Sequence, residues 1–278
     1  MENIQFIIKD YHISKLGIGN IMKCLISALS VNPDTVIECY PQYEYGAYDS
    51  ILQDRFIFKG KGHKELEKVY TCRLLILSNE EPYQQDIPME EWYVDGLENP
   101  RFHHFFTFKK RIDWNYDASL VDERVKYRMF KTIDSIQFTD MVYHEVQRLT
   151  DMFRDQSALG ISVRTWKSSH ESNIDRPYQF ATYRDKILQI IQEHCEVSTI
   201  VLSIDNQSFL EPYLHLFEET EKRVIILDRL KHWNPIQYAI IKVLVLSKCS
   251  YVIGNRISTF TELVFWFGKC RPQIYTVG

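Results

Sequence analysis

The segment ALGISVR, residues 158–164, predicts a β-strand that is buried on both of its faces. Strands that are apolar throughout occur in parallel sheets covered by helices on each side, so this segment indicates an α/β fold. The predicted strand ends on Arg164, whose guanidinium is always charged. A ligand that carries phosphate or carboxylate would explain such a charge at the end of an interior strand. The alternative is an arginine that extends to the surface or pairs with a neighbouring acid.

Helices and strands alternate from this segment to the carboxyl end of the chain. Apolar residues recur at helical spacing between the predicted strands, which is the pattern of helices with one buried face. We predict helices at 178–195, 207–219, 234–250 and 258–268, and strands at 198–205, 223–228, 251–255 and 273–277. This alternation predicts a parallel sheet with helices on both faces.

The amino-terminal half of the chain is less regular. Strands are predicted at 4–9, 35–39, 54–60 and 71–78, a helix at 19–30, and a long helical stretch at 119–153. A chain of 278 residues suits two domains of ordinary size. We therefore predict two α/β lobes with a cleft between them, an amino-terminal lobe at 1–150 and a carboxyl-terminal lobe at 151–278.

Composition and charge exclude several classes of protein. A hydrophobic fraction of 45% and a charged fraction of 25% are typical of soluble globular proteins. The formal net charge of -4 argues against nucleic acid or an anionic membrane as a partner. The amino-terminal residues MENIQFIIKD predict neither a signal peptide nor a membrane anchor. The six cysteines form no Cys-x-x-Cys pair, so we expect a reducing, cytoplasmic environment.

Two further strand ends carry side chains that suit a nucleotide. Asp205 ends one predicted strand, where its carboxylate could accept hydrogen bonds from a base or ribose, or cap the helix that begins near Gln207. Ser258 and Thr259 open a helix whose unpaired N–H groups could bind phosphate, although Thr259 with Glu262 also fits a capping box. Together with the arginine, these strand ends favour a nucleoside diphosphate.

The phosphate and metal motifs of other enzyme classes are missing. The sequence has no Gly-x-x-x-x-Gly-Lys-Ser/Thr loop and no Gly-x-Gly-x-x-Gly fingerprint. It has no His-Glu-x-x-His motif, and no Asp-x-Asp of the kind that holds a metal in many nucleotide-sugar transferases. We therefore expect neither a metal nor a separate cofactor.

The order of these segments resembles the fucosyltransferase-like superfamily of GT-B glycosyltransferases. The group includes protein O-fucosyltransferases, α1,6-fucosyltransferases and nodulation fucosyltransferases. Its Gly-Gly-x-Gly-Asn loop corresponds to LGIGN at 16–20, and its strand ending His-x-Arg corresponds to SVR at 162–164. A strand ending in Asp corresponds to LSID at 202–205, and the last motif corresponds to LVLSKCSYVIGNRISTF at 244–260.

The resemblance implies a two-lobed, inverting glycosyltransferase that needs no metal and binds a nucleotide sugar and a glycan or glycoprotein acceptor. Arg164 would bind the diphosphate and stabilise the leaving group, and Asn20 would lie beside the reacting centre. The other implied donor-binding residues are Gly17, Gly19, Ser162, Asp205, Asn255, Arg256, Ser258, Thr259 and Phe260. Among these, Ser258, Thr259 and Phe260 would hold the phosphates, and Asp205 would contact the base.

Two positions depart from the family pattern. Leu16 replaces the first glycine of the loop, and Ser162 replaces a histidine that helps the family to recognise guanine. A uridine donor such as UDP-xylose is therefore an alternative to GDP-fucose.

The acceptor side is less defined. Tyr43 and Tyr45 lie in an aromatic segment that could stack on a sugar, or that could pack on its own rings. Glu44 and Asp10 are possible catalytic bases. Two other functions stay open: a non-catalytic glycan-binding protein, and a different phosphate-binding enzyme on a doubly wound sheet.

Overall fold

The computed structural model describes residues 6–8, 19, 22, 26, 37–39, 56–58, 116–120, 123–165, 178–227, 233, 235–255 and 258–277. The chain forms two compact units. The first contains Met1–His144 and Trp233–Ile241, and the second contains Glu145–His232 and Lys242–Gly278. The lobe boundary at residue 150 stays a prediction.

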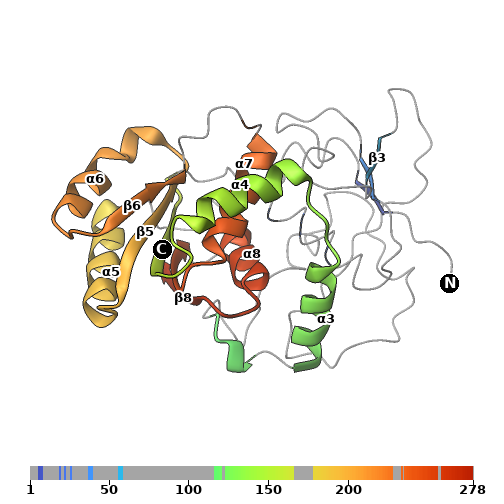
Figure 1. Cartoon of the computed structure of the whole chain (residues 1–278), viewed down its shortest axis with the longest axis horizontal. Helices are drawn as coiled ribbons and strands as arrows, with labels where there is room; N and C mark the ends of the chain where they lie inside the picture. The colour runs from blue at the N-terminus through green and yellow to red at the C-terminus, as the bar shows by residue number, and fades with distance from the viewer. Residues whose placement is uncertain are drawn as a thin grey trace. The chain divides into compact units, whose positions relative to one another are not determined.

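A five-stranded parallel sheet organises the second unit (Figure 1). Its strands are β4 (Ser157–Val163), β5 (Val197–Ile204), β6 (Arg223–Ile226), β7 (Tyr251–Asn255) and β8 (Gln273–Val277). Their order across the sheet is β6-β5-β4-β7-β8. The first strand, β4, is therefore central, and later strands add first on one side of it and then on the other. The structure thus confirms the parallel sheet and all five strands predicted for this half of the chain.

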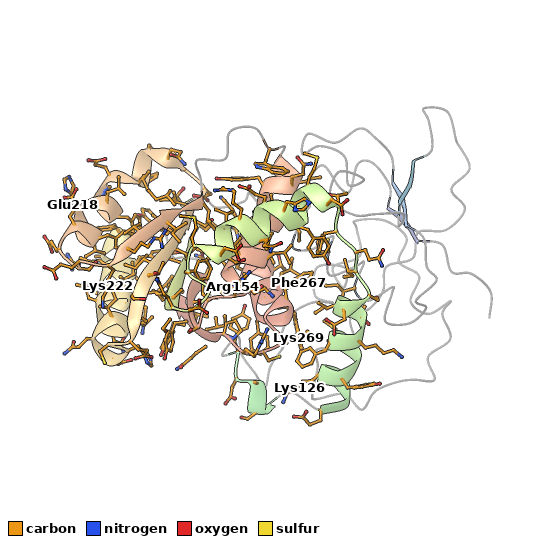
Figure 2. All side chains as sticks on the ribbon, viewed as in Figure 1. Lys126, Arg154, Glu218, Lys222, Phe267 and Lys269 are labelled. Carbon is orange, nitrogen blue, oxygen red and sulfur yellow. The ribbon has the colours of Figure 1, made fainter. Side chains whose placement is uncertain are left out.

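Helices cover both faces of this sheet. Figure 1 shows α5 (Phe180–Glu193) and α6 (Glu211–Glu218) on one side, and α8 (Thr259–Phe267) on the other. Successive side chains in a strand point to opposite faces of the sheet. The buried residues of β4 therefore contribute to a core on each face, and helices cover both cores. Figure 2 shows side chains filling the space between the helices and the strands of this unit. On the face that α5 covers, the core contains Leu159, Ile161, Val163, Tyr183, Ile187 and Ile190.

The opposite face of β4 meets the carboxyl end of α7 (Pro235–Leu246) at Gly160. A Cβ atom at Gly160 would lie 2.9 Å from Cδ2 of Leu246 and 3.1 Å from Sγ of Cys249. A closer approach occurs at Gly254 in β7, where a Cβ atom would lie 2.4 Å from Oγ1 of Thr261 in α8. Gly254 therefore allows the first turn of α8 to pack directly on its strand.

The first unit also contains a parallel sheet. Its described strands are β1 (Phe6–Ile8), β2 (Ile37–Cys39) and β3 (Phe56–Phe58), in the order β1-β2-β3. Gly19, Met22 and Ile26 are helical and buried, in agreement with the predicted helix at 19–30. The strand predicted at 71–78 lies outside the described residues.

The long helical stretch predicted at 119–153 is divided into separate helices. The structure has a short 3-10 helix, η5 (Ala118–Leu120), followed by α3 (Glu123–Asp134) and α4 (Asp140–Asp151). At the break, Ile136 and Phe138 are buried, so the apolar spacing continues although the helix does not. In the part of the chain that the structure describes, no helix has the length and apolar character needed to span a membrane.

We predict that Gly254→Ala destabilises the protein by about 1–3 kcal/mol, because the new methyl group has to displace α8 from the strand. Gly160→Ala is the matched control, and its cost should be smaller, since the nearest atom is the end of a leucine side chain. Removing the obstructing atoms in Gly254→Ala/Thr261→Ala should restore part of the lost stability. The free energy of unfolding in urea measures all three, and equal costs for the two glycine substitutions would contradict the tight contact.

Candidate nucleotide-binding site

The order of the strands places a topological switch point between β4 and β7. Ligands of open α/β sheets bind beyond the carboxyl ends of the strands at such a point, because the chain leaves the two strands in opposite directions. Ile161 of β4 pairs with Ile253 of β7, and Val163 pairs with Ile204 of β5. This register brings the ends of β4, β5 and β7, which carry Arg164, Asp205 and Asn255, to the same edge of the sheet.

Tyr183 links two of these strand ends. Its hydroxyl lies 3.0 Å from Oδ1 of Asn255, and the Arg164 N–H donates to it at 3.4 Å. The Ser162 carbonyl oxygen lies 3.4 Å from the same hydroxyl. Burial raises the pKa of the Tyr183 phenol above its ordinary value, so it stays protonated and can donate. Within the helix predicted at 178–195, the sequence indicates only that Tyr183 lies on the buried face.

Asp205 holds the residue after Arg164. Both oxygens of its carboxylate lie 3.0 Å from the Thr165 nitrogen, and Thr165 Oγ1 donates to Oδ1 at 2.6 Å. The alternative in which Asp205 caps the following helix is wrong. That 3-10 helix, η7 (Gln207–Phe209), is capped by Asn206, whose side chain accepts from Ser208 N at 3.0 Å.

Ser258 caps α8, the helix that follows β7. Its side chain accepts from the Thr261 N–H at 3.5 Å, and it is buried. The predicted capping box at Thr259 and Glu262 is therefore wrong by one residue, because Thr259 is already the first residue of the helix. The remaining N–H groups of this first turn, at Thr259 and Phe260, belong to the end of a helix that carries positive partial charge.

Aromatic rings lie next to Asp205. The rings of Tyr178 and Phe209 meet edge to face with centroids 5.0 Å apart, and the Tyr178 hydroxyl donates to Tyr213 at 3.1 Å. Burial raises the pKa of Tyr178, and the negative charge of Asp205 adds to the rise. Phe209 exposes 37% of its surface although it is apolar. The exposed ring of Phe209 thus packs on a tyrosine that lies within the influence of the Asp205 charge.

Several predicted residues lie outside the described part of the chain. They are Asn20, Gly17, Arg256, Tyr43 and Tyr45, together with Asp10, Leu16 and Glu44. Gly19 is described and is buried. The roles inferred for all of them stay predictions.

No protein-family model and no curated protein matches the sequence. Solved structures do match the fold. The fucosyltransferase NodZ from Bradyrhizobium aligns over 95% of this chain and 93% of its own, with a TM-score of 0.51 and 14% identity. A mutant of FUT1 from Arabidopsis thaliana in complex with GDP aligns over 99% of this chain and 70% of its own, with a TM-score of 0.57 and 13% identity. POFUT1 in complex with GDP aligns over 98% of both chains, with a TM-score of 0.51 and 7% identity.

The chain has a fucosyltransferase-like fold. These alignments run through nearly the whole chain, and they confirm the fucosyltransferase-like fold that the resemblance implies. At this level of identity the likeness concerns the fold alone, because one fold can carry many functions.

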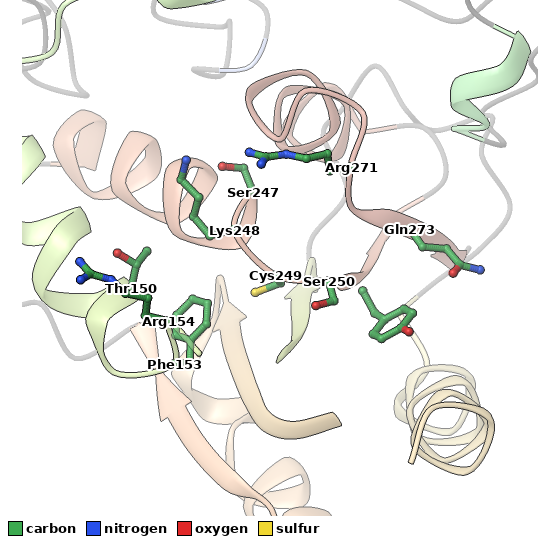
Figure 3. A pocket seen from close by; sticks show the side chains of 10 residues that line it. Thr150, Phe153, Arg154, Ser247, Lys248, Cys249, Ser250, Arg271 and Gln273 are labelled. Carbon is green, nitrogen blue, oxygen red and sulfur yellow. The ribbon is translucent and has the colours of Figure 1, made fainter. Parts of the chain in front are cut away.

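A pocket of about 600 Å³ lies at the opposite, amino-terminal edge of the same sheet (Figure 3). Its lining includes Arg154, Lys248 and Arg271. These cations follow the carboxyl ends of α4, α7 and α8, where each helix carries a partial charge of about −0.5. Arg154 also pairs with Asp151, and Arg271 Nε donates to the Gly268 carbonyl at 3.2 Å. The helix ends therefore explain the positions of these basic residues. The phosphate site predicted from the sequence lies at the carboxyl-terminal edge of the sheet, away from this pocket.

Among the residues that the structure describes, no group of three or more His, Cys, Asp or Glu side chains could hold a metal ion. The expectation of a metal-independent protein stays a prediction. The described free cysteines are Cys195, Cys249 and Cys270.

We predict that Tyr183→Phe lowers the free energy of unfolding by about 1 kcal/mol, because the Arg164 N–H loses its acceptor and Asn255 loses a donor. Tyr127→Phe removes the same hydroxyl from a side chain that is 71% exposed and should change stability little. Urea denaturation of both variants tests this. Equal free energies of unfolding for Tyr183→Phe and the unaltered protein would show that the hydroxyl does not stabilise the ends of β4 and β7.

Proposed function

We propose that this protein is a glycosyltransferase that moves a sugar from a nucleotide-sugar donor to a hydroxyl group of a glycan. The convergence of Arg164, Asp205 and the start of α8 at the switch point is the observation that supports this most. These groups offer a guanidinium, a carboxylate and a helix amino terminus, which suit a diphosphate, a base or ribose, and a phosphate respectively. The fold adds support, since structural neighbours were solved with GDP or GDP-fucose.

Arg164 would bind the diphosphate of the donor. Two parallel hydrogen bonds from a planar guanidinium match the geometry of phosphate oxygens. The peptide N–H groups of Thr259 and Phe260, behind the Ser258 cap, would bind the distal phosphate at the start of α8. Neither contact requires a metal, so we propose that positive charge from the protein replaces it.

The proposed reaction is a single displacement with inversion at the anomeric carbon. The acceptor hydroxyl oxygen forms a bond to that carbon while the bond from carbon to the diphosphate oxygen breaks, and the diphosphate leaves with the electron pair. The acceptor proton goes to a general base, for which Glu44 and Asp10 are the candidates from the first unit. Asn20 would lie beside the reacting carbon, in the cleft of a GT-B enzyme.

The donor is proposed to be a GDP sugar, with fucose as the sugar. Asp205 would accept from the base, and the exposed ring of Phe209 would lie against its plane. A specific observation favours a second donor class: Ser162 stands where the family has a histidine that contacts guanine, so a UDP sugar such as UDP-xylose is the alternative.

Two other functions have distinct signatures. A non-catalytic glycan-binding relative would bind glycans but leave the nucleotide sugar intact. A different phosphate-binding enzyme would bind phosphates without preferring nucleotide sugars. A panel of nucleotide sugars, assayed by thermal shift and by slow release of free sugar, separates these from a transferase, which should be stabilised and should hydrolyse its donor.

We predict that Arg164→Lys lowers kcat about a hundredfold, or about 3 kcal/mol of transition-state stabilisation. Lysine keeps the charge but loses the planar pair of donors, and the loss should fall mainly on kcat because charge on the leaving group grows during the reaction. Steady-state kinetics with the donor found in the panel measures this. A melting curve serves as the control, and a near-normal kcat would remove Arg164 from the mechanism.

We predict that EDTA leaves the activity unchanged, because Arg164 and the α8 terminus neutralise the diphosphate. Activity that falls on chelation and returns with Mn²⁺ would contradict the metal-free mechanism.

Calorimetric titration with GDP and UDP decides the donor class: tighter binding of GDP supports a guanine donor, and tighter binding of UDP supports the uridine alternative.

A further inference from the structure

Asp205 and Thr165 form a direct link between two strand ends. The carboxylate accepts from the Thr165 N–H and from its hydroxyl, at 3.0 Å and 2.6 Å, although the two residues are 40 positions apart in the sequence. We call this link, made of the Asp205 carboxylate with the Thr165 amide and hydroxyl, the 165–205 brace. Hydrogen bonds to a carboxylate are about twice as strong as bonds between neutral groups.

The brace completes a set of contacts around Arg164. On one side, the Arg164 N–H donates to the buried Tyr183 hydroxyl at 3.4 Å. Just before Arg164, the Val163 carbonyl accepts from Asp205 N at 3.3 Å, which extends the pairing of β4 and β5 by one residue. Just after it, the brace fixes Thr165. The backbone that carries the guanidinium is thus held before, at and after Arg164.

Helix capping does not explain the carboxylate of Asp205, because Asn206 caps the helix that follows. An ionised carboxylate offers about four acceptor positions, so the bonds from Thr165 leave capacity for a ligand. A residue that only contacted a base would not need to hold the backbone next to Arg164.

From these contacts we propose that Asp205 and Thr165 are positioning residues, which orient Arg164 toward the diphosphate. The inference rests on the proposed function, because it assumes that Arg164 binds a diphosphate. It goes beyond that function by giving Asp205 a second role. Besides contacting the base, Asp205 would strengthen the contact between Arg164 and the diphosphate. Preorganisation of this kind matters because small misplacements of a charged donor weaken its contact with the ligand.

The test uses inorganic pyrophosphate and GDP as probes in calorimetric titrations of the full chain. Thr165→Val removes the hydroxyl donor with little change of volume, and should weaken binding of both probes about threefold to tenfold. Thr165→Ser keeps the hydroxyl and should restore binding. Thr182→Val is the matched control on the exposed face of α5, and should bind both probes as the unaltered protein does.

A double-mutant cycle identifies the residue through which the brace acts. If it acts through Arg164, then Thr165→Val should have little further effect on pyrophosphate binding in an Arg164→Lys background, so the two effects are not additive. Additive effects, or pyrophosphate binding by Thr165→Val equal to that of the unaltered protein, would overturn the proposal. If the unaltered protein binds neither pyrophosphate nor GDP nor UDP, the proposed function itself is contradicted. The positioning role proposed for Asp205 and Thr165 is then contradicted as well.

Discussion

The pairing of β4 with β5 on one side and β7 on the other is the constraint on which the candidate site depends. Parallel strands in register bring their carboxyl ends to one edge, so residues far apart in the sequence become neighbours there. Because β4 is both the first and the central strand of its sheet, β5 and β6 add on one side of it, and β7 and β8 add on the other. Arg164 and Asn255 follow the ends of β4 and β7 at this edge, and Ser258 begins the helix that comes after β7.

The side chains around this edge hold the backbone as well as offering groups to a ligand. The buried Tyr183 hydroxyl joins the end of β4 to the end of β7 through Asn255. Gly254 lets α8 start close to its strand, which brings the helix terminus to the same edge. These contacts hold the backbone of the candidate site in place, and charges that are fixed before the reaction stabilise a leaving group most effectively.

Much of this arrangement could be predicted from the sequence, because strand ends in a parallel sheet share one edge. The strand at 158–164, the alternation that follows it, and the placement of Arg164 and Asp205 all came from apolar patterning. The sequence placed the helix caps at Asp205 and Thr259, one residue away from the observed caps Asn206 and Ser258. Asp and Asn cap about equally well, as do Ser and Thr, so the sequence alone does not fix the residue at which each helix begins. Tyr183 and Thr165 could not be assigned, because a hydroxyl on a buried helix face looks like any core position, and the partner of a loop threonine depends on the register of the sheet. Asn20 and Arg256 stay predictions, as do the acceptor-side tyrosines.

Hydrogen–deuterium exchange with and without GDP tests the central claim most directly, which is that a nucleotide binds at the carboxyl edge of β4 and β7. Binding should slow amide exchange at 163–165, at 205–209 and at 258–262, where the backbone N–H groups lie next to the proposed ligand. UDP, run in parallel, should protect the same segments if the uridine donor is correct. Protection confined to 247–251 and 268–273, which border the pocket at the opposite edge, would contradict the account.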